Sequence, residues 1–380
     1  MNRKMGSGIM LTLLFIGMSA LAFKVQPVKG WTGTVYIRAY GSIDPPDAPM
    51  ITYDNVTYTL TDNITGSADG VVVERDNIVL DGAGYTVQGT GSGSGISLSE
   101  RTNVTISNME VKAFLIGIYL DNSSKNCISE NNIRENSQGI YVYGSNEPHE
   151  TESWHNTIVG NDITENGGGI LLEEAKFNNV SGNNITENHG NVDYPLRPGG
   201  IYIFLNSLGN VVSGNNIINN GAGIETYHGD GVGIFENNIK NNNVGLNLFP
   251  GHVTAFHNNF ISNPHQTVAY SIEENIWDNG CEGNYWSDSN GTDSDGDGIA
   301  DNPYVIDENN QDNHPLMAPY LVGDMNHDGI VDDSDLLSLS EVYGAQLGGD
   351  NWNCHCDFNE DGIVDIYDLA LVGKNYGKTA

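Results

Sequence analysis

The sequence predicts a right-handed parallel β-helix with three short strands per turn, a mainly β fold followed by a small all-α module. The first observation is a phrase of two Asn and an apolar residue, as in Asn131-Asn132-Ile133, which recurs between residues 106 and 263. Apolar residues also form three columns, with steps of 21 or 22 residues and two longer steps of 30 and 32. A solenoid needs such columns, because each turn buries its face only against its neighbours.

The third observation is the length of the segments between turn signals, which are four to six residues long and rich in Ile, Val and Tyr. Segments this short that alternate in polarity are typical of strands. Asn and Gly are expected at the corners because both tolerate the left-handed backbone conformation. One Asn per turn at the same corner would let the side-chain amides hydrogen-bond along the stack as a ladder.

In chain order, residues 1–22 are predicted to be a signal peptide. Arg3 and Lys4 precede an apolar run over residues 9–23, and Ala20-Leu21-Ala22 offers a cleavage site. An uncleaved anchor is the alternative, although the run is short for a membrane span. We therefore expect a secreted or cell-surface protein with no transmembrane segment after cleavage.

The remaining chain divides by composition. Residues 31–75 are expected to form an N-terminal cap and first strands, 76–270 the β-helix, and 271–320 an aromatic C-terminal cap. Caps cover sheet edges that would otherwise aggregate. The two long steps place about eight extra residues within 143–154 and nine within 189–198. These insertions either carry binding function or are tolerated length variation.

The charge excludes one class of partner. The chain has 15 Lys and Arg against 49 Asp and Glu, a net charge of −34, so nucleic acid and anionic membranes are not expected partners. The four cysteines are Cys127, Cys281, Cys354 and Cys356. A bridge between Cys354 and Cys356 would be strained, and free thiols are the prediction, with a soft-metal site including His355 as the alternative.

Much of the acidity has the spacing of calcium ligands. Residues 324–335 and 357–368 are two copies of a loop with oxygen ligands at positions 1, 3, 5, 9 and 12, a backbone carbonyl at position 7 and Gly at position 6. The sequence therefore predicts bound Ca²⁺. The predicted ligands are Asp324, Asn326, Asp328, Ile330, Asp332 and Asp335, and Asp357, Asn359, Asp361, Ile363, Asp365 and Asp368.

With Asp at position 12 and a duplicated loop–helix unit, residues 323–380 resemble a type I dockerin module with paired EF-hand-like loops. The resemblance implies docking to a cohesin-type domain on another protein, with positions 10 and 11 of each loop contributing to recognition. These positions are Asp333 and Ser334 in the first loop, and Ile366 and Tyr367 in the second. The two pairs differ, so one loop is able to dominate recognition.

A third acidic loop lies in the predicted C-terminal cap. It contains Asp293, Asp295, Asp297 and Asp301, but its position 12 is Tyr304. Calcium that staples the cap is the favoured interpretation, and an ordinary Asp/Gly turn is the alternative.

Together with residues 81–84 and 283–288, this loop makes the body resemble the NosD-like group of surface and periplasmic β-helix proteins. The resemblance implies the fold and export, and relatives are described as carbohydrate-binding or sugar-hydrolase-like. The sequence shows no His, Met or Cys cluster suited to copper.

Catalytic candidates on the predicted β-helix are weak. Glu173 and Glu225 are expected two turns apart, on the order of 12 Å from each other, which is too wide for a glycosidase pair. His228 beside Asp230 is as readily a turn pair as a catalytic one. A polysaccharide lyase or glycoside hydrolase therefore remains an alternative function.

Outward positions of the strand after the corner Gly form two columns that are rich in aromatic residues. Flat aromatic faces suit a sugar chain, and Glu150, Asp193 and Arg197 of the insertions are possible polar contacts. The alternative is that the rings stack to stabilise neighbouring turns. The predicted carbohydrate-binding residues are Tyr119, Tyr141, Tyr143, Tyr202, Phe204, Tyr227 and Phe249.

Taken together, these patterns predict an exported, calcium-binding β-helix protein that binds extracellular polysaccharide and docks to a cohesin-type partner. The alternatives are the β-helix enzymes above, and a structural cell-surface protein without carbohydrate specificity.

Overall fold

The computed structural model describes residues 30–145, 153–190, 198–270 and 274–380. The predicted signal peptide and the insertion residues Glu150, Asp193 and Arg197 lie outside the described residues. Within the described ranges, no helix has both the length and the apolar character needed to cross a membrane.

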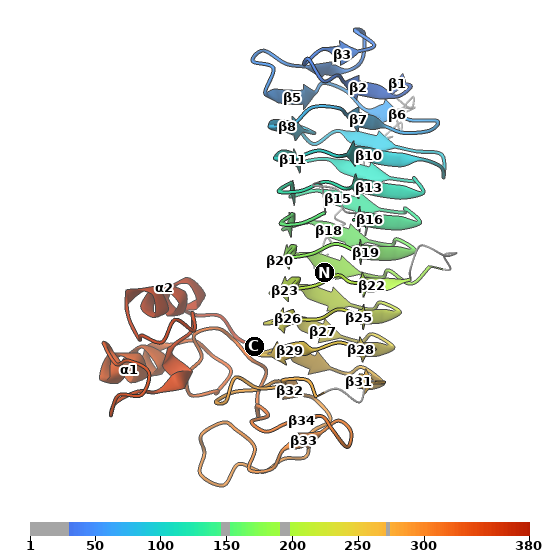
Figure 1. Cartoon of the computed structure of the whole chain (residues 1–380). Coiled ribbons are helices and arrows are strands. Elements are labelled where there is room, and N and C mark those ends of the chain that lie inside the picture. The colour runs from blue at the N-terminus through green and yellow to red at the C-terminus, as the bar shows by residue number, and fades with distance from the viewer. Residues whose placement is uncertain (1–29, 146–152, 191–197, 271–273) are drawn as a thin grey trace, which may run out of the picture. The chain divides into compact units, whose positions relative to one another are not determined.

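The strands β1 to β32 form three sheets, which together make up the body of the protein (Figure 1). From β7 onward, each complete turn gives one strand to each sheet, and these strands pair in parallel with those of the next turn. The first sheet contains β1 (Trp31–Thr32), β6 (Ile64–Thr65), β9 (Thr86–Gln88), β12 (Glu110–Lys112), β15 (Asn132–Arg134), β18 (Asp162–Thr164), β21 (Asn184–Thr186), β24 (Asn216–Ile218), β27 (Asn238–Lys240), β30 (Asn259–Ile261) and β32 (Tyr285–Trp286).

The other two sheets follow the same stacking order. The second sheet contains β3 (Ile43–Asp44), β2 (Val35–Ile37), β7 (Val71–Val73), β10 (Ser94–Ser99), β13 (Ile116–Asp121), β16 (Gln138–Tyr143), β19 (Gly168–Glu173), β22 (Gly199–Phe204), β25 (Ala222–Tyr227), β28 (Val244–Leu248) and β31 (His265–Ala269). The third sheet contains β29 (Val253–Phe256), β26 (Val232–Phe235), β23 (Val211–Ser213), β20 (Asn179–Ser181), β17 (Thr157–Val159), β14 (Cys127–Ser129), β11 (Val104–Ser107), β8 (Ile78–Asp81), β5 (Thr57–Leu60) and β4 (Met50–Ile51).

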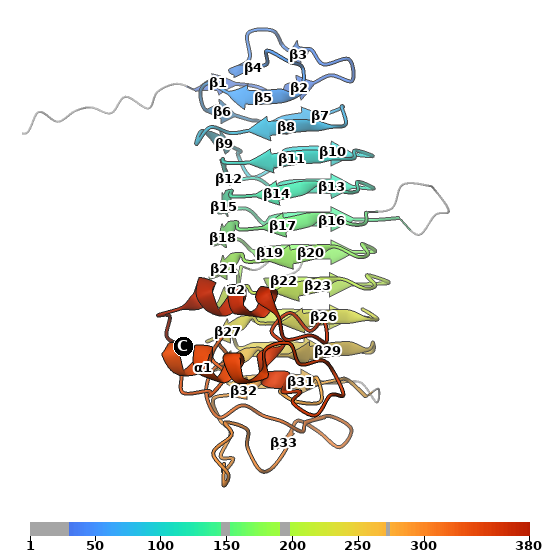
Figure 2. The same cartoon turned by 90° about the vertical axis from the view of Figure 1, so that its left-hand side faces the viewer.

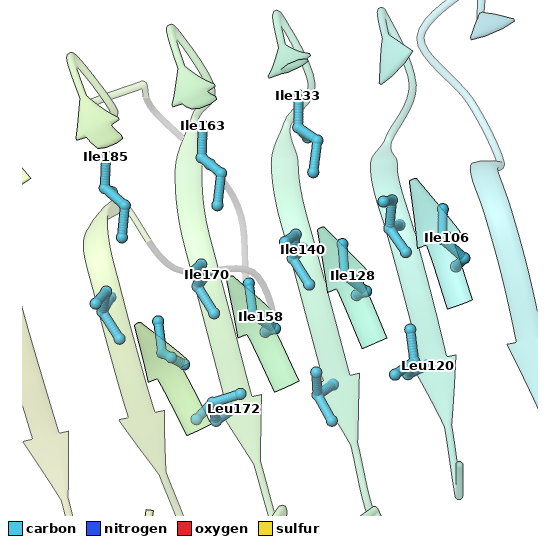
Figure 3. Packing of buried hydrophobic residues seen from close by; sticks show 14 of the residues in the cluster. Ile106, Leu120, Ile128, Ile133, Ile140, Ile158, Ile163, Ile170, Leu172 and Ile185 are labelled. Atoms are coloured by element: carbon cyan, nitrogen blue, oxygen red, sulfur yellow. The ribbon is translucent and has the colours of Figure 1, made fainter. Parts of the chain in front are cut away.

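The predicted apolar columns form the core (Figure 3). Each column belongs to one sheet, and equivalent residues of successive turns pair directly. Their side chains are essentially inaccessible to solvent. The prediction of a parallel β-helix with three strands per turn is therefore confirmed. Members labelled in Figure 3 include Ile133, Ile163 and Ile185 of the first sheet, Ile140 and Ile170 of the second, and Ile106, Ile128 and Ile158 of the third.

The predicted Asn ladder exists three times over in the described turns. In each ladder the side-chain NH2 donates to the Oδ1 of the next Asn, and that Oδ1 also accepts from the backbone N–H of the previous Asn. All these side chains are buried, so the ladders satisfy backbone groups that water cannot reach. The ladders are Asn126-156-178-210, Asn131-161-183-215-237-258-284 and Asn136-166-188-220-242-263.

One detail of the corner prediction is wrong. The ladder Asn residues of the repeating turns do not adopt the left-handed conformation, which belongs instead to the residue before each of them. Before Asn131 this residue is Glu130, with φ of 57°, and before Asn161 it is Gly160, with φ of 65°. The Asn is selected for its buried hydrogen bonds rather than for its backbone.

Replacing a ladder Asn is expected to destabilise the body strongly. Asn183→Ala removes an amide that donates to the carbonyl of Ile158 and to Asn215 Oδ1, and it leaves the buried backbone N–H of Asn161 without its acceptor. We expect a loss of about 3 kcal/mol in the free energy of unfolding, because buried polar groups remain unpaired. Chemical denaturation measures it.

The matched control for that substitution is Asn184→Ala. The Asn184 side chain bonds Asp162 and Asn216 on the outer surface of the first sheet, where water replaces lost partners. Its expected effect is about 0.5 kcal/mol. Equal losses for Asn183→Ala and Asn184→Ala would show that burial of the ladder does not matter.

The ends of the stack depart from the parallel pattern. At the N-terminal end, β3 pairs antiparallel with β2, and β4 pairs antiparallel with β5. At the other end, the ring of Trp286 stacks on Phe260 of the last regular turn at 4.4 Å, and Tyr304 stacks on Trp286 at 4.2 Å. A short antiparallel pair, β33 (Tyr304–Val305) and β34 (Gln311–Asp312), follows.

The last residues form a small helical module (Figure 2). Its helices α1 (Asp333–Val342) and α2 (Ile366–Asn375) lie against each other, and a 3-10 turn, η1 (Cys354–Cys356), lies between them in sequence. Both helices begin with a capping box. The buried core is small and consists of Met325, Val331, Leu339, Cys356, Val364 and Val372.

Candidate metal loops, aromatic face and histidine cluster

The two predicted calcium loops have the same internal geometry. In the first, the carboxylate of Asp324 accepts from the N–H groups of Asp328 and Gly329 at 3.2 and 2.8 Å. Gly329 has φ of 84°, a conformation that favours glycine, as the pattern requires at position 6. Asp335 at position 12 is buried and accepts from the N–H of Met325 and of Asp332, both at 2.8 Å, which ties the two ends of the loop together.

The second loop repeats these bonds. Asp357 accepts from Asp361 and Gly362 at 3.2 and 2.9 Å, and Asp368 accepts from Phe358 and Asp365 at 2.8 Å each. Identical bonds in two copies show that the loop conformation is set by the sequence pattern rather than by local surroundings.

In both loops the carboxyl group at position 1 has a raised pKa, which a bound cation would lower. Burial raises the pKa of Asp324, and the nearby Asp335 and Asp328 carboxylates raise it further. Burial likewise raises the pKa of Asp357. A divalent ion bound among these oxygens would favour their charged forms.

The third acidic loop reproduces only the start of the pattern. Asp293 accepts from Gly296, Asp297 and Gly298, and Gly298 has φ of 86°. The carboxylates of Asp293, Asp295 and Asp297 lie together. The remaining two positions are engaged elsewhere. Asp301 bonds Thr292 and Ser294, and the Tyr304 hydroxyl bonds Asp288.

The positions implied in partner recognition are exposed. Ile366 and Tyr367 at the start of α2 are 55% and 65% exposed, and Asp333 and Ser334 are exposed at the start of α1. Asp333 accepts a hydrogen bond from the Tyr376 hydroxyl at 2.7 Å. The N-terminal residues of α1 and α2 therefore differ in their contacts as well as in their sequence. Those of α2 are apolar and aromatic, whereas those of α1 are polar.

The two outward columns of the second sheet align as predicted. Tyr119, Tyr141, Leu171, Tyr202, Glu225 and Asn247 pair in one column, and Asp121, Tyr143, Glu173, Phe204 and Tyr227 pair in the other.

Exposure along these columns is uneven, and the expectation of solvent-facing side chains is wrong for the central turns. Tyr141, Tyr202 and Phe204 are only 7–8% exposed, and Leu171 between them is fully buried. They form an apolar cluster of their own on the outside of the sheet. Their role in carbohydrate binding stays a prediction.

The aromatic row becomes more open toward the last turns. Rings of Phe204, Tyr227, Phe249 and Tyr270 follow one another at centroid distances of 5.3, 5.3 and 5.0 Å. Tyr227 and Phe249 are half-buried, and Tyr270, which the sequence analysis did not select, is 64% exposed. Tyr119 and Tyr143 are also half-buried.

The weak catalytic candidates do not assemble into a pair. Glu173 is buried and accepts from the Tyr141 hydroxyl, while Glu225 accepts from Asn247 at 2.8 Å in the other column. Asp230 does not pair with His228 in the described structure. Its partner is His252 of the next turn at 2.7 Å, and this hydrogen bond lowers the pKa of Asp230.

The prediction of free thiols is wrong for Cys281 and Cys354. They form a disulfide across 73 residues, with Cα atoms 6.3 Å apart, a separation that suits the bond. Cys127 and Cys356 are free. The bond joins the C-terminal cap to the turn η1 of the helical module.

Beside this disulfide lies a cluster that the sequence analysis missed. Glu282 is 6% exposed, and three histidines surround its carboxylate. Its Oε1 is bonded by His355 and lies 3.2 Å from Nε2 of His327, and its Oε2 lies 2.9 Å from Nε2 of His257. Burial alone would raise the pKa of Glu282, but the three imidazoles hold it well below its usual range.

No sequence spacing connects these four residues, because they come from the end of the third sheet, the cap, the first calcium loop and η1. The sequence shows no His, Met or Cys cluster suited to copper, and the fold adds this Glu-centred group of three histidines. Tyr320 stacks on His257 at 4.0 Å and covers the cluster on one side.

Comparison with known families finds two matches. The family described as "Periplasmic copper-binding protein (NosD)" matches residues 51–291, and the type I dockerin domain matches residues 322–376. No curated protein matches the chain.

Solved structures with similar architecture are distant. They include pectate lyase Pel9A (15% identity, TM-score 0.44, 61% of this chain and 64% of that chain) and alginate lyase from Paenibacillus sp. str. FPU-7 (16%, 0.43, 58% and 83%). Tailspike protein 2 of bacteriophage CBA120 has 16% identity and a TM-score of 0.42 over 56% of this chain. The chain spans about a third of the tailspike chain, 34% of its length.

Proposed function

The chain belongs to the NosD family and carries a type I dockerin domain at its C-terminus. We propose that it is an exported, calcium-binding protein. In this proposal its β-helix binds polysaccharide and its dockerin binds a partner that carries a cohesin domain. The observation that supports docking most directly is the pair of acidic loops with the same internal hydrogen bonds, each followed by exposed recognition positions. Ca²⁺ is the ion that suits their oxygen ligands.

Of the two helix starts, the second is favoured as the docking surface. Ile366 and Tyr367 expose an apolar and an aromatic side chain, and such side chains contribute most to protein–protein affinity when they become buried. The corresponding polar pair, Asp333 and Ser334, offers less apolar area. A titration with a type I cohesin domain tests this part of the proposal, and binding is expected only in the presence of calcium.

Polysaccharide binding is supported by the open end of the aromatic row. Tyr227, Phe249 and Tyr270 stand on three successive turns with ring centroids 5.3 and 5.0 Å apart. Partly exposed rings in a line offer flat faces for successive sugar units. Asn247 and Glu225, hydrogen-bonded to each other in the neighbouring column, add polar groups that suit hydroxyls.

Removing two of these rings is expected to weaken retention on a glycan. Tyr227→Ala combined with Phe249→Ala should cost about 1–3 kcal/mol of binding free energy per ring that stacks on the ligand, by analogy with other aromatic stacking surfaces. A glycan panel is scored for both binding and product release with the unmodified protein and this variant.

Two controls make the glycan experiment decisive. Tyr53→Ala removes a ring that is 94% exposed but far from the row in sequence, and it should leave binding intact. Tyr202→Ala should lower thermal stability, because its ring is buried. No retention on any glycan would support the structural alternative, and released product would support the lyase or hydrolase alternative.

A further inference from the structure

The cluster around Glu282 has the composition of a metal site that the calcium loops do not explain. Glu282, His327 and His355 each offer one ligand atom, and these three atoms lie within 4.8 Å of one another. The side chain of His327 is only 4% exposed and that of Glu282 is 7% exposed. Three donor atoms thus converge from the C-terminal cap, the first calcium loop and η1.

Two nitrogen atoms of the cluster have no hydrogen bond. Nε2 of His327 is buried and close to Glu282 Oε1, but its direction does not suit a hydrogen bond. Nε2 of His257 behaves in the same way toward Oε2. Buried polar atoms without partners are rare, and the unpaired nitrogen of His327, which converges with Glu282 and His355, indicates a missing ligand.

The donor set suits a divalent ion. An imidazole coordinates a metal through the lone pair of a ring nitrogen, and His327 and His355 offer one such nitrogen each, while the carboxylate of Glu282 supplies an oxygen and one negative charge.

We propose that Glu282, His327 and His355 bind a divalent transition-metal ion of the Zn²⁺ type, which joins the C-terminal cap to the dockerin. Two imidazoles and one carboxylate suit zinc, whereas calcium prefers an all-oxygen set. His257 is a positioning residue that holds the second carboxylate oxygen, as partners of metal-ligating carboxylates commonly do.

The disulfide supports this assignment. Cys281 and Cys354 each directly precede a proposed ligand, Glu282 and His355, so the covalent bond brings these two ligands together before a metal binds. His327 comes from the first calcium loop, so that loop's closure around Ca²⁺ would place the third ligand. The zinc site and the calcium loops therefore cooperate.

The test is a titration of the calcium-saturated, full-length protein with Zn²⁺ by isothermal calorimetry. We expect one equivalent to bind in the presence of excess calcium. Glu282→Gln and His355→Ala should abolish this binding, and His257→Ala should weaken it about 10- to 100-fold. The control is His252→Ala, an imidazole that is 64% exposed and pairs with Asp230.

A readout on the unmodified protein guards against variants that fail to fold. X-ray absorption of the zinc-loaded chain should show only nitrogen and oxygen ligands, at about 2.0–2.1 Å, with imidazole scattering. A sulfur shell at about 2.3 Å would overturn the assignment in favour of a cysteine site. The absence of saturable binding, or binding unchanged in Glu282→Gln, would equally overturn it.

Discussion

Removal of calcium is expected to unfold the helical module and leave the three-sheet body folded. The module has six buried apolar residues in its core, so we expect metal binding to contribute much of its folding free energy. At a calcium concentration a thousandfold above the dissociation constant, this contribution is about 4 kcal/mol. Far-ultraviolet circular dichroism and limited proteolysis with and without chelator measure the loss of α1 and α2.

The double variant Asp324→Ala with Asp357→Ala should reproduce the effect of the chelator. Its matched control is Asp350→Ala, which removes an exposed carboxylate from the same module outside both loops. Cohesin binding should disappear together with the helical signal. An unchanged helical signal and unchanged cohesin affinity after chelation would rule out calcium as the ion that folds these loops.

Loss of the Cys281–Cys354 disulfide is the second large effect that we expect. The bond closes a loop across 73 residues, and the loss of chain entropy in the unfolded state corresponds to about 4 kcal/mol of stabilisation for a loop of this size. Cys281→Ser should therefore lower the unfolding temperature of the cap and module, as scanning calorimetry would show.

The control for this substitution is Cys127→Ser, because Cys127 is a free, half-buried thiol in β14. The body should respond little to either change, because Cys281 lies in the cap and Cys127 is not part of the buried core of the body. If Cys281→Ser and Cys127→Ser had the same small effect, the disulfide would not stabilise the folded chain.

The fold of the body was predictable because the sequence features that determine it are local and recur in every turn. The spacing from Ile133 to Ile163 and Ile185 shows which residues share a column, and strand alternation shows which face they occupy. The same reasoning misplaced the left-handed corners. The Asn recurs in every turn and therefore marks the corner in the sequence. The residue before it, which adopts the left-handed conformation, differs from turn to turn, as Glu130 and Gly160 show.

The conformation of the two acidic loops was predictable for a related reason, since the residues that form each loop lie within twelve positions of one another. The histidine cluster was not, because His257 and His355 are brought to Glu282 only by the packing of separate segments. The burial of the Tyr202 side chain was also not predictable from the sequence. Alternation identifies an outward side chain, but it does not reveal what covers that side chain in the folded protein.

The Asn ladders also bear on how long the protein stays folded. An interior turn is hydrogen-bonded to a neighbour on each side, whereas a terminal turn has only one such neighbour, so we expect opening to begin at an end and proceed turn by turn. The unfolding rate, rather than the equilibrium, then determines resistance to proteases. That rate depends on the Trp286 stack at one end and on the β2–β3 and β4–β5 pairs at the other, so a few residues set the lifetime of the whole column.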